Sequence, residues 1–213
     1  MLVDTSPDLR EQLLGAAVDR LDGVLMTHSH ADHTHGIDDL RPVVIAMRKR
    51  IDIHMDEATS RVVRQAFGYI FEAPPGSLYP PLLKEERLTS GRAARIEGPG
   101  GLIEALPFRL DHGDISALGF RFGALAYTPD LNAIPADAVQ FLEGLDAWII
   151  GGLRHKPHPS HFSVGEALAW IARMRPRRAV ITNLHTDLDY EELKARLPAN
   201  VTPAYDGMRI EGF

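Results

Sequence analysis

Residues 23–36 read Gly-Val-Leu-Met-Thr-His-Ser-His-Ala-Asp-His-Thr-His-Gly, and this stretch decides how the rest of the chain is interpreted. The apolar run Val24–Met26 predicts a short buried strand. A pattern H-x-H-x-D-H follows it, formed by His28, His30, Asp32 and His33. Residues two apart on an extended strand end point to the same side, so we expect His28 and His30 to reach one cation. After the turn that must follow, Asp32 and His33 face a second position.

The ligand types in this stretch limit the choice of metal. Imidazole nitrogens and carboxylate oxygens together suit Zn, Mn or Fe, whereas Ca and Mg prefer oxygen ligands alone. A surface turn rich in histidine is the alternative interpretation. Nine of the ten histidines lie at 28–35, 112, 155–161 and 185, so four separate clusters are available to build a site for two metals. The tenth, His54, is expected either to be a half-buried strand residue or to line the site.

Composition narrows the class of protein. A chain of 213 residues, 45% hydrophobic and 24% charged, fits one globular domain over 1–213. The formal net charge of -6 argues against a general binder of nucleic acid or of anionic membranes. Since there is no cysteine, disulfides, thiolate metal sites and cysteine nucleophiles are excluded. The first residues have no export-signal pattern and no run is long enough to span a bilayer, so we expect a cytoplasmic protein.

The remaining pattern predicts alternating strands and helices. Helices are expected after Ser6-Pro7 and over 56–71, 136–142 and 189–197, and a capping box at Ser163–Glu166 begins another. Strands are expected at 51–55, 102–110, 117–122, 124–128, 147–150 and 178–184, with a closing hairpin over 201–205 and 208–211. Residues 42–50 fit a helix or a strand. Residues 72–101 have no sustained period and are expected to be a long loop facing the substrate.

Together with Gly-Ile-Asp-Asp-Leu-Arg at 36–41, the histidine-rich stretch resembles the metal motif of the metallo-β-lactamase-fold hydrolases. The chain is most similar to the phosphoribosyl 1,2-cyclic phosphate phosphodiesterase branch of phosphonate breakdown, over nearly its whole length. The resemblance implies an α/β (α+β) fold, the four-layer α/β/β/α metallo-β-lactamase sandwich. Members of this branch usually carry further strands before the equivalent of Leu2–Thr5, so we expect some N-terminal strands of the sandwich to be lacking.

The resemblance also implies two divalent transition metals, Zn or Mn. His112, in Leu-Asp-His-Gly-Asp, and Asp130, in Tyr-Thr-Pro-Asp, match ligand positions of the family. The implied ligands are His28, His30 and His112 for one metal and Asp32, His33 and His185 for the other, with Asp130 bridging both. Many relatives have a histidine directly after the equivalent of Thr182, where this chain has Asn183. By strand alternation His185 points to the same side as Asn183, so we expect His185 to be the last ligand and Asn183 a nearby polar contact.

In the implied mechanism, a hydroxide that bridges the metals attacks phosphorus, and Asp32 belongs to the catalytic machinery. His161 matches the family's histidine near the substrate and would give a proton to the leaving alkoxide. His155 and His158 receive no firm role. The expected partner is a small cyclic or linear phosphodiester, without nucleic acid or membrane, and a homodimer is left open.

Other hydrolases use the same metal scaffold, so an RNA-processing endonuclease, a thiolesterase or a lactamase is an alternative. A metal-binding protein without turnover is a second class, favoured by Asn183 and by Gly151-Gly152, where relatives have an acidic residue. Asp38 and Asp39 are expected in salt bridges or a helix cap. Arg41 and Arg154 fit either a phosphate contact or a structural role.

Overall fold

The computed structural model describes residues 1–213 and divides the chain into two compact units, Met1–Ile103 and Glu104–Phe213. Each unit has its own hydrophobic core. None of the helices combines the length with the apolar character needed to cross a bilayer. The expectation of one domain over 1–213 stays a prediction.

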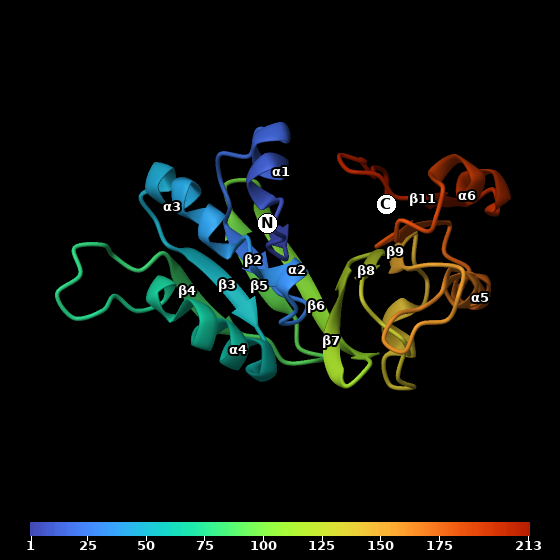
Figure 1. Ribbon diagram of the computed structural model, residues 1–213, viewed down its shortest axis with the longest axis horizontal. Coiled ribbons are helices and arrows are strands. Elements are labelled where there is room, and N and C mark those ends of the chain that lie inside the picture. Colours follow the sequence, from blue (N-terminus) through green and yellow to red (C-terminus); the bar gives the residue numbers. More distant parts are fainter. The chain divides into compact units, whose positions relative to one another are not determined.

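The first unit is built on a parallel four-stranded sheet with the order β1-β2-β3-β4. These strands are β1 (Leu2–Val3), β2 (Gly23–Leu25), β3 (Ile51–Met55) and β4 (Leu83–Arg87). Parallel neighbours require crossover connections, and helices α1 (Leu9–Gly15), α3 (Arg41–Met47) and α4 (Glu57–Phe67) supply them (Figure 1).

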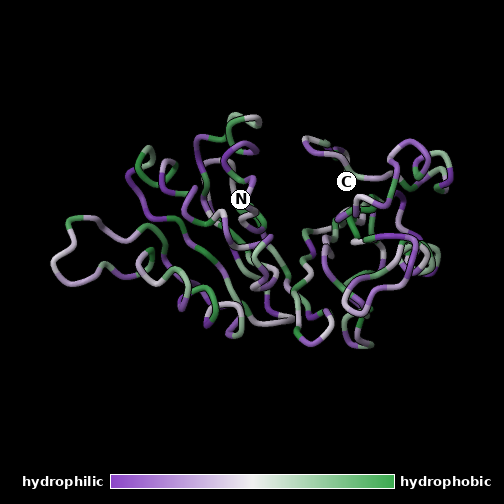
Figure 2. Tube along the Cα trace, viewed as in Figure 1, coloured by the Kyte–Doolittle hydropathy of each residue, from purple (hydrophilic) through white to green (hydrophobic).

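One face of this sheet is covered by the three helices. Ile51, Ile53 and Met55 alternate along β3 and share one buried cluster with residues of α1, α3 and α4. Hydrophobic and hydrophilic residues alternate along α4 in Figure 2, as a helix with one buried face requires. Asp56 begins α4, because its side chain accepts a hydrogen bond from the Thr59 amide at 2.8 Å.

Shorter elements complete the first unit. They are α2 (Ala31–Thr34), the 3-10 turns η1 (Ile37–Leu40) and η2 (Gly68–Ile70), and strand β5 (Ala94–Gly98). The prediction of one loop over 72–101 was wrong, because β4 and β5 lie inside it. Four of the five residues of β4 are charged, so its sequence lacks the apolar alternation that marks a strand, and pairing with β3 fixes its structure instead.

The second sheet has the order β11-β10-β9-β8-β7-β6-β5, and its strands from residue 104 onward form the sheet of the second unit. They are β6 (Gly101–His112), β7 (Ile115–Phe122), β8 (Leu125–Thr128), β9 (Ala147–Gly151), β10 (Arg178–Thr182) and β11 (Val201–Pro203). Strands β6, β7 and β8 pair antiparallel, whereas β8, β9, β10 and β11 pair parallel.

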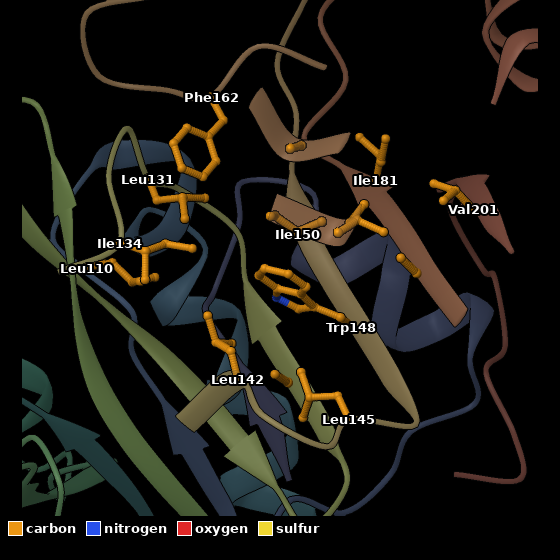
Figure 3. Close-up of a cluster of buried hydrophobic side chains, with 14 of the residues drawn as sticks. Leu110, Leu131, Ile134, Leu142, Leu145, Trp148, Ile150, Phe162, Ile181 and Val201 are labelled. Atoms are coloured by element: carbon orange, nitrogen blue, oxygen red, sulfur yellow. The ribbon is translucent and has the colours of Figure 1, made fainter. Parts of the chain in front are cut away.

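Helices α5 (Val164–Met174) and α6 (Tyr190–Arg196) and the 3-10 turn η3 (Val139–Leu142) pack on this sheet. The predicted capping box is confirmed, because the Ser163 side chain accepts from the Glu166 amide and the Glu166 carboxylate accepts from the Ser163 amide. The core centres on Trp148 of β9, which is fully buried (Figure 3). Its indole Nε1 donates to Thr128 Oγ1 at 3.0 Å, so the one polar atom of this side chain is satisfied.

Two further expectations differ from the structure. The helix expected over 136–142 is only the short turn η3. The closing hairpin is absent, because β11 pairs parallel with β10 and no strand forms over 208–211. The Asp206-Gly207 turn is present, but the residues after it form no strand.

We expect the stability of the first unit to depend on Glu85 in a pH-dependent way. Its carboxylate accepts from Ser60 Oγ at 2.6 Å and from Arg64 Nε at 2.5 Å. Burial alone raises the pKa of Glu85, but these hydrogen bonds outweigh it and hold the pKa below its ordinary 4.5. In Glu85→Gln we expect a loss of about 1–2 kcal/mol in unfolding free energy at pH 7.

A carboxyl group whose pKa is lowered on folding stabilises the protein above its unfolded pKa. The advantage of the wild type over Glu85→Gln should therefore shrink as the pH falls below 4.5. Urea unfolding at several pH values measures this difference. Glu97→Gln, at an exposed position of β5, is the matched control. A difference that stays constant down to the acid transition would contradict the role given to Glu85.

Candidate metal sites

The first cluster of candidate ligands follows β2 directly. His28 is buried, His30 is exposed, and Asp32 and His33 lie in the first turn of α2. The His28 ring lies 4.6 Å from the His30 ring and 4.2 Å from the His33 ring, measured between centroids. Gly36 ends the turn, since a Cβ there would lie 1.9 Å from the Ser6 carbonyl oxygen. The backbone thus returns close to the start of the chain.

Asp4, which directly follows β1, organises this cluster. Its carboxylate is 8% exposed and accepts from the Thr27 amide at 2.7 Å, from Thr27 Oγ1 at 2.8 Å and from His33 Nδ1 at 2.8 Å. A buried carboxylate is tolerated when donors surround it in this way. Asp4 is 23 residues from Thr27 and 29 from His33, so no local pattern in the sequence reveals these contacts.

These hydrogen bonds determine which nitrogen of each ring carries the proton. Because a carboxylate only accepts, His33 Nδ1 donates to Asp4, and the lone pair of His33 is on Nε2. The Thr27 hydroxyl gives its proton to Asp4 and therefore accepts from His28 Nδ1 at 3.0 Å. The lone pair of His28 is then also on Nε2. Metal-ligating histidines are oriented in this manner by carboxylates.

Asp32 shows that the cluster fits a cation. Its Oδ2 lies 3.4 Å from His33 Nε2. With the proton of His33 on Nδ1, these two atoms are both acceptors, and a positive charge between them relieves the repulsion. A carboxylate that stays ionised beside an imidazole is a suitable ligand pair for Zn or Mn.

The second cluster joins three elements of the second unit. His112 ends β6, Asp130 follows β8, and His161 precedes α5. One ligand atom from each of these residues lies within 4.8 Å of the others. His112 is fully buried and Asp130 is 1% exposed. Burying an imidazole and a carboxylate costs free energy unless the two groups share a cation or a proton.

His112 has the same arrangement as His33. Its Nδ1 donates to the Ser160 carbonyl oxygen at 2.6 Å, so its lone pair is on Nε2, which lies 3.6 Å from Asp130 Oδ2. His161 Nδ1 lies 3.9 Å from the same oxygen. Asp130 Oδ2 therefore faces two imidazoles, and His112 Nε2 together with Asp130 offers a donor pair that fits a divalent metal.

Asn183, rather than His185, lies beside Asp130. Asn183 Nδ2 donates to Asp130 Oδ1 at 2.6 Å. The backbone of Asn183 is left-handed with φ of 58°, so strand alternation ends there and the argument that placed His185 on the same side fails. The His185 side chain is 42% exposed, and its Nδ1 faces Asp187 at 3.4 Å. It does not join the group of His112, Asp130 and His161.

The loop that carries His161 is held by its own residues. Arg154 donates to the carbonyl oxygens of Lys156 and Pro157, which is a structural role. His158 Nδ1 accepts from the Ser160 amide at 3.3 Å, and its ring lies 5.0 Å from that of His161. His155 is exposed. Of the three histidines in this loop, only His161 approaches Asp130.

Other residues marked in the sequence lie in structural contacts. Asp38 pairs with Arg41 at 2.7 Å and Asp39 with Arg10 at 2.6 Å, as expected for salt bridges. At Gly151 a Cβ would lie 1.7 Å from the Pro129 carbonyl oxygen, so the backbone before Asp130 leaves no room for a side chain.

Comparisons with known proteins agree with these clusters. A family model described as a beta-lactamase superfamily domain matches residues 1–183, a range that includes both clusters and Asn183 but not His185. A solved structure of a new diphosphatase from the PhnP family is 31% identical, with a TM-score of 0.89, and the match covers 100% of this chain and 80% of that one.

Two further matches bear on the interpretation. Zn(2+)-bound PqqB from Methylobacterium extorquens is 17% identical with a TM-score of 0.72, over 99% of this chain and 83% of that one, and shows the fold alone. An octanoyltransferase of Porphyromonas gingivalis is 32% identical over 98% of this chain. The chain spans only 41% of that relative's length, so the relative's name describes a much longer protein.

We expect Asp4→Asn to weaken metal binding without removing a ligand. The amide would place a donor among the donors of Thr27 and His33, so the rings of His28 and His33 would lose their fixed tautomers. Losses of such orienting groups typically cost about 10–100-fold in metal affinity. Competition with a chromophoric chelator measures the affinity. Asp39→Asn, which removes an exposed salt bridge, serves as the control, and equal affinities of the two variants would refute the role of Asp4.

The chelator competition assay, together with the metal content of the protein, tests whether Asn183 or His185 contributes to metal binding. Asn183→Ala releases Asp130 Oδ1 from its anchor, so we expect about 10-fold weaker binding or more. His185→Ala should retain the metal content and affinity of the wild type. Loss of one bound metal in His185→Ala alone would show that His185 is a ligand after all.

Proposed function

The chain belongs to the beta-lactamase superfamily and, within it, to the PhnP family, and from this premise we propose that this metal-dependent hydrolase cleaves a small phosphodiester. The observation that carries the proposal is the set of imidazoles whose protons are fixed on Nδ1 by Asp4, Thr27 and the Ser160 carbonyl. Such rings present Nε2 lone pairs beside carboxylates, which is what a catalytic metal site needs.

We assign the ligands in two groups, following the family pattern. His28, His30, Asp32 and His33 are proposed as metal ligands in the first unit, and His112 and Asp130 in the second. Asn183 supports Asp130 through its hydrogen bond and takes the place of the last imidazole ligand. We propose Zn or Mn as the physiological metal, because both accept mixed imidazole and carboxylate ligands. Divalent cations bound there would activate water and neutralise charge on the phosphoryl oxygens.

His161 is proposed to provide the proton for the leaving group. Its Nδ1 lies 3.9 Å from the Asp130 carboxylate, beside the proposed metal ligands. When the P–O bond breaks, the leaving alkoxide would take the proton of His161 and depart as an alcohol. The product is a phosphate monoester, and a cyclic diester would open without losing a fragment.

The same clusters support a second candidate, cleavage of a diphosphate ester, because the PhnP-family relative of 31% identity is a diphosphatase. The two candidates differ in the leaving group. A phosphate leaving group is stable as an anion and needs little help from a proton, whereas an alkoxide needs much. The contribution of His161 therefore distinguishes them. Acyl transfer, suggested by the name of the longer octanoyltransferase, has no separate support in these clusters.

We also propose that the substrate is a small molecule. The net charge of -6 does not favour a polyanionic strand of RNA or DNA, whose binding depends on neutralising many phosphates.

The test is hydrolysis by protein loaded with Zn or Mn. The panel comprises bis(p-nitrophenyl) phosphate, a ribose cyclic phosphate, a sugar nucleotide diphosphate, a lactam and a thioester. We expect turnover of the first two substrates and a loss of about 1,000-fold or more in Asp32→Ala. His161→Ala should lose about 100–10,000-fold on the ribose cyclic phosphate, because its leaving group is an alkoxide, and much less on the p-nitrophenyl ester.

Metal content completes this experiment. His161→Ala should keep the bound metals of the wild type, since its proposed role is proton donation, and the exposed His155→Ala should keep both metals and activity. Failure of the metal-loaded protein to cleave either phosphodiester would refute the proposal. Turnover of the diphosphate ester alone would replace it with the second candidate.

A further inference from the structure

A cavity of about 450 Å³ lies in the first unit, and none of the candidate metal ligands lines it. It is formed by the ends of β3 and β4, the turn after β4 and the start of β5. Cavities of this size hold small-molecule ligands in many proteins. The residues of its wall that bear on the ligand are Asp52, His54, Glu86, Thr89, Arg92 and Arg95.

His54 is the residue that marks the cavity as a binding site. It is 7% exposed and lines the cavity, and its ring nitrogens are not sealed away from solvent. A ring nitrogen that is open to a cavity can form a hydrogen bond with a group of a bound ligand. Burial also lowers the pKa of His54, and a neutral imidazole offers one donor and one acceptor. A hydroxyl group is a matching partner.

The acidic residues of the wall do not make the cavity a cation site. Glu86 is the neighbour of His54 across β3 and β4, and it forms an ion pair with Lys84. Asp52 faces the same lysine at 4.0 Å. Lys84 offsets only part of the negative charge of these two carboxylates. His54, Asp52 and Glu86 do not gather their ligand atoms closely enough for a metal ion, so a metal ion is disfavoured.

Two arginines of the cavity wall, Arg92 and Arg95, can bind an anion. Arg92 and Arg95 are exposed and form no ion pair in the structure, whereas Arg87 is held by Glu57 at 3.1 Å and by Glu85 at 3.0 Å. Arg92 is fixed by a tight turn in which its amide donates to the Thr89 carbonyl oxygen at 3.0 Å. The amide of Leu88 donates to the Met55 carbonyl oxygen, which ties this turn to the end of β3.

We propose that this cavity binds a small phosphate monoester that carries hydroxyl groups, with the phosphate on Arg92 and Arg95 and a hydroxyl on His54. A guanidinium fork matches the oxygens of a phosphate, and two forks with no competing carboxylate hold it at the mouth. The neutral ring at the wall then recognises the uncharged part of the ligand. This site is separate from the proposed catalytic clusters and does not depend on the proposed function.

The experiment titrates the metal-loaded full chain with glucose 6-phosphate, inorganic phosphate and glucose. Calorimetry gives the dissociation constants, and NMR of the imidazole groups reports whether His54 is in contact. We expect glucose 6-phosphate to bind more tightly than inorganic phosphate and to shift the His54 signals, and glucose not to bind. The double variant Arg92→Gln/Arg95→Gln should weaken glucose 6-phosphate by about 10-fold or more, because it removes two charged hydrogen-bonding groups.

Two controls make the result specific. Arg10→Gln/Arg61→Gln removes the same charge at exposed positions outside the cavity and should leave the dissociation constant unchanged. His54→Gln should reduce the preference for glucose 6-phosphate over inorganic phosphate. The proposal is overturned if glucose 6-phosphate does not bind, or if it binds equally to the Arg92→Gln/Arg95→Gln variant, as it would at the metals. Because neither readout needs turnover, failure of the hydrolase proposal does not affect the result.

Discussion

The carboxylate of Asp4 is the contact on which the first cluster depends. It is buried at the end of β1 and is satisfied only when Thr27 and His33 bring their donors to it. Asp4 also has a left-handed backbone, with φ of 58°, which is uncommon for a residue other than glycine. Strain of this kind persists where surrounding contacts enforce it, often at functional sites. One charged group therefore sets the turn of the chain and the direction of two imidazole rings.

The sequence predicted the elements whose signals are local. The strand before His28, the capping box of α5 and the salt bridge between Asp38 and Arg41 each depend on residues close in the chain. Strand β4 was missed because its residues are mostly charged and show no apolar alternation. Glu85 forms hydrogen bonds with α4, and Glu86 forms an ion pair with Lys84. The role of Asp4 was missed because its partners lie more than twenty residues away.

The second cluster shows the limit of strand alternation as a guide. His112 and Asp130 were placed from family likeness, and the structure brings them together with His161. His185 was placed by counting two residues from Asn183, and that count presumes a strand that continues. The left-handed Asn183 ends the regular pattern and turns its amide to Asp130. A single dihedral angle therefore decides which of two polar residues reaches the carboxylate.

Both tryptophans of the chain, Trp148 and Trp170, belong to the second unit. Trp148 is sealed in its core, and Trp170 lies on α5 under the guanidinium of Arg173. Tryptophan emission therefore reports on the second unit, whereas far-ultraviolet circular dichroism records the helices and strands of both units. The two signals follow one curve during denaturation only when the two units unfold as a single cooperative body. The placement of one buried indole thus provides an optical measure of how strongly the two halves of the chain are coupled.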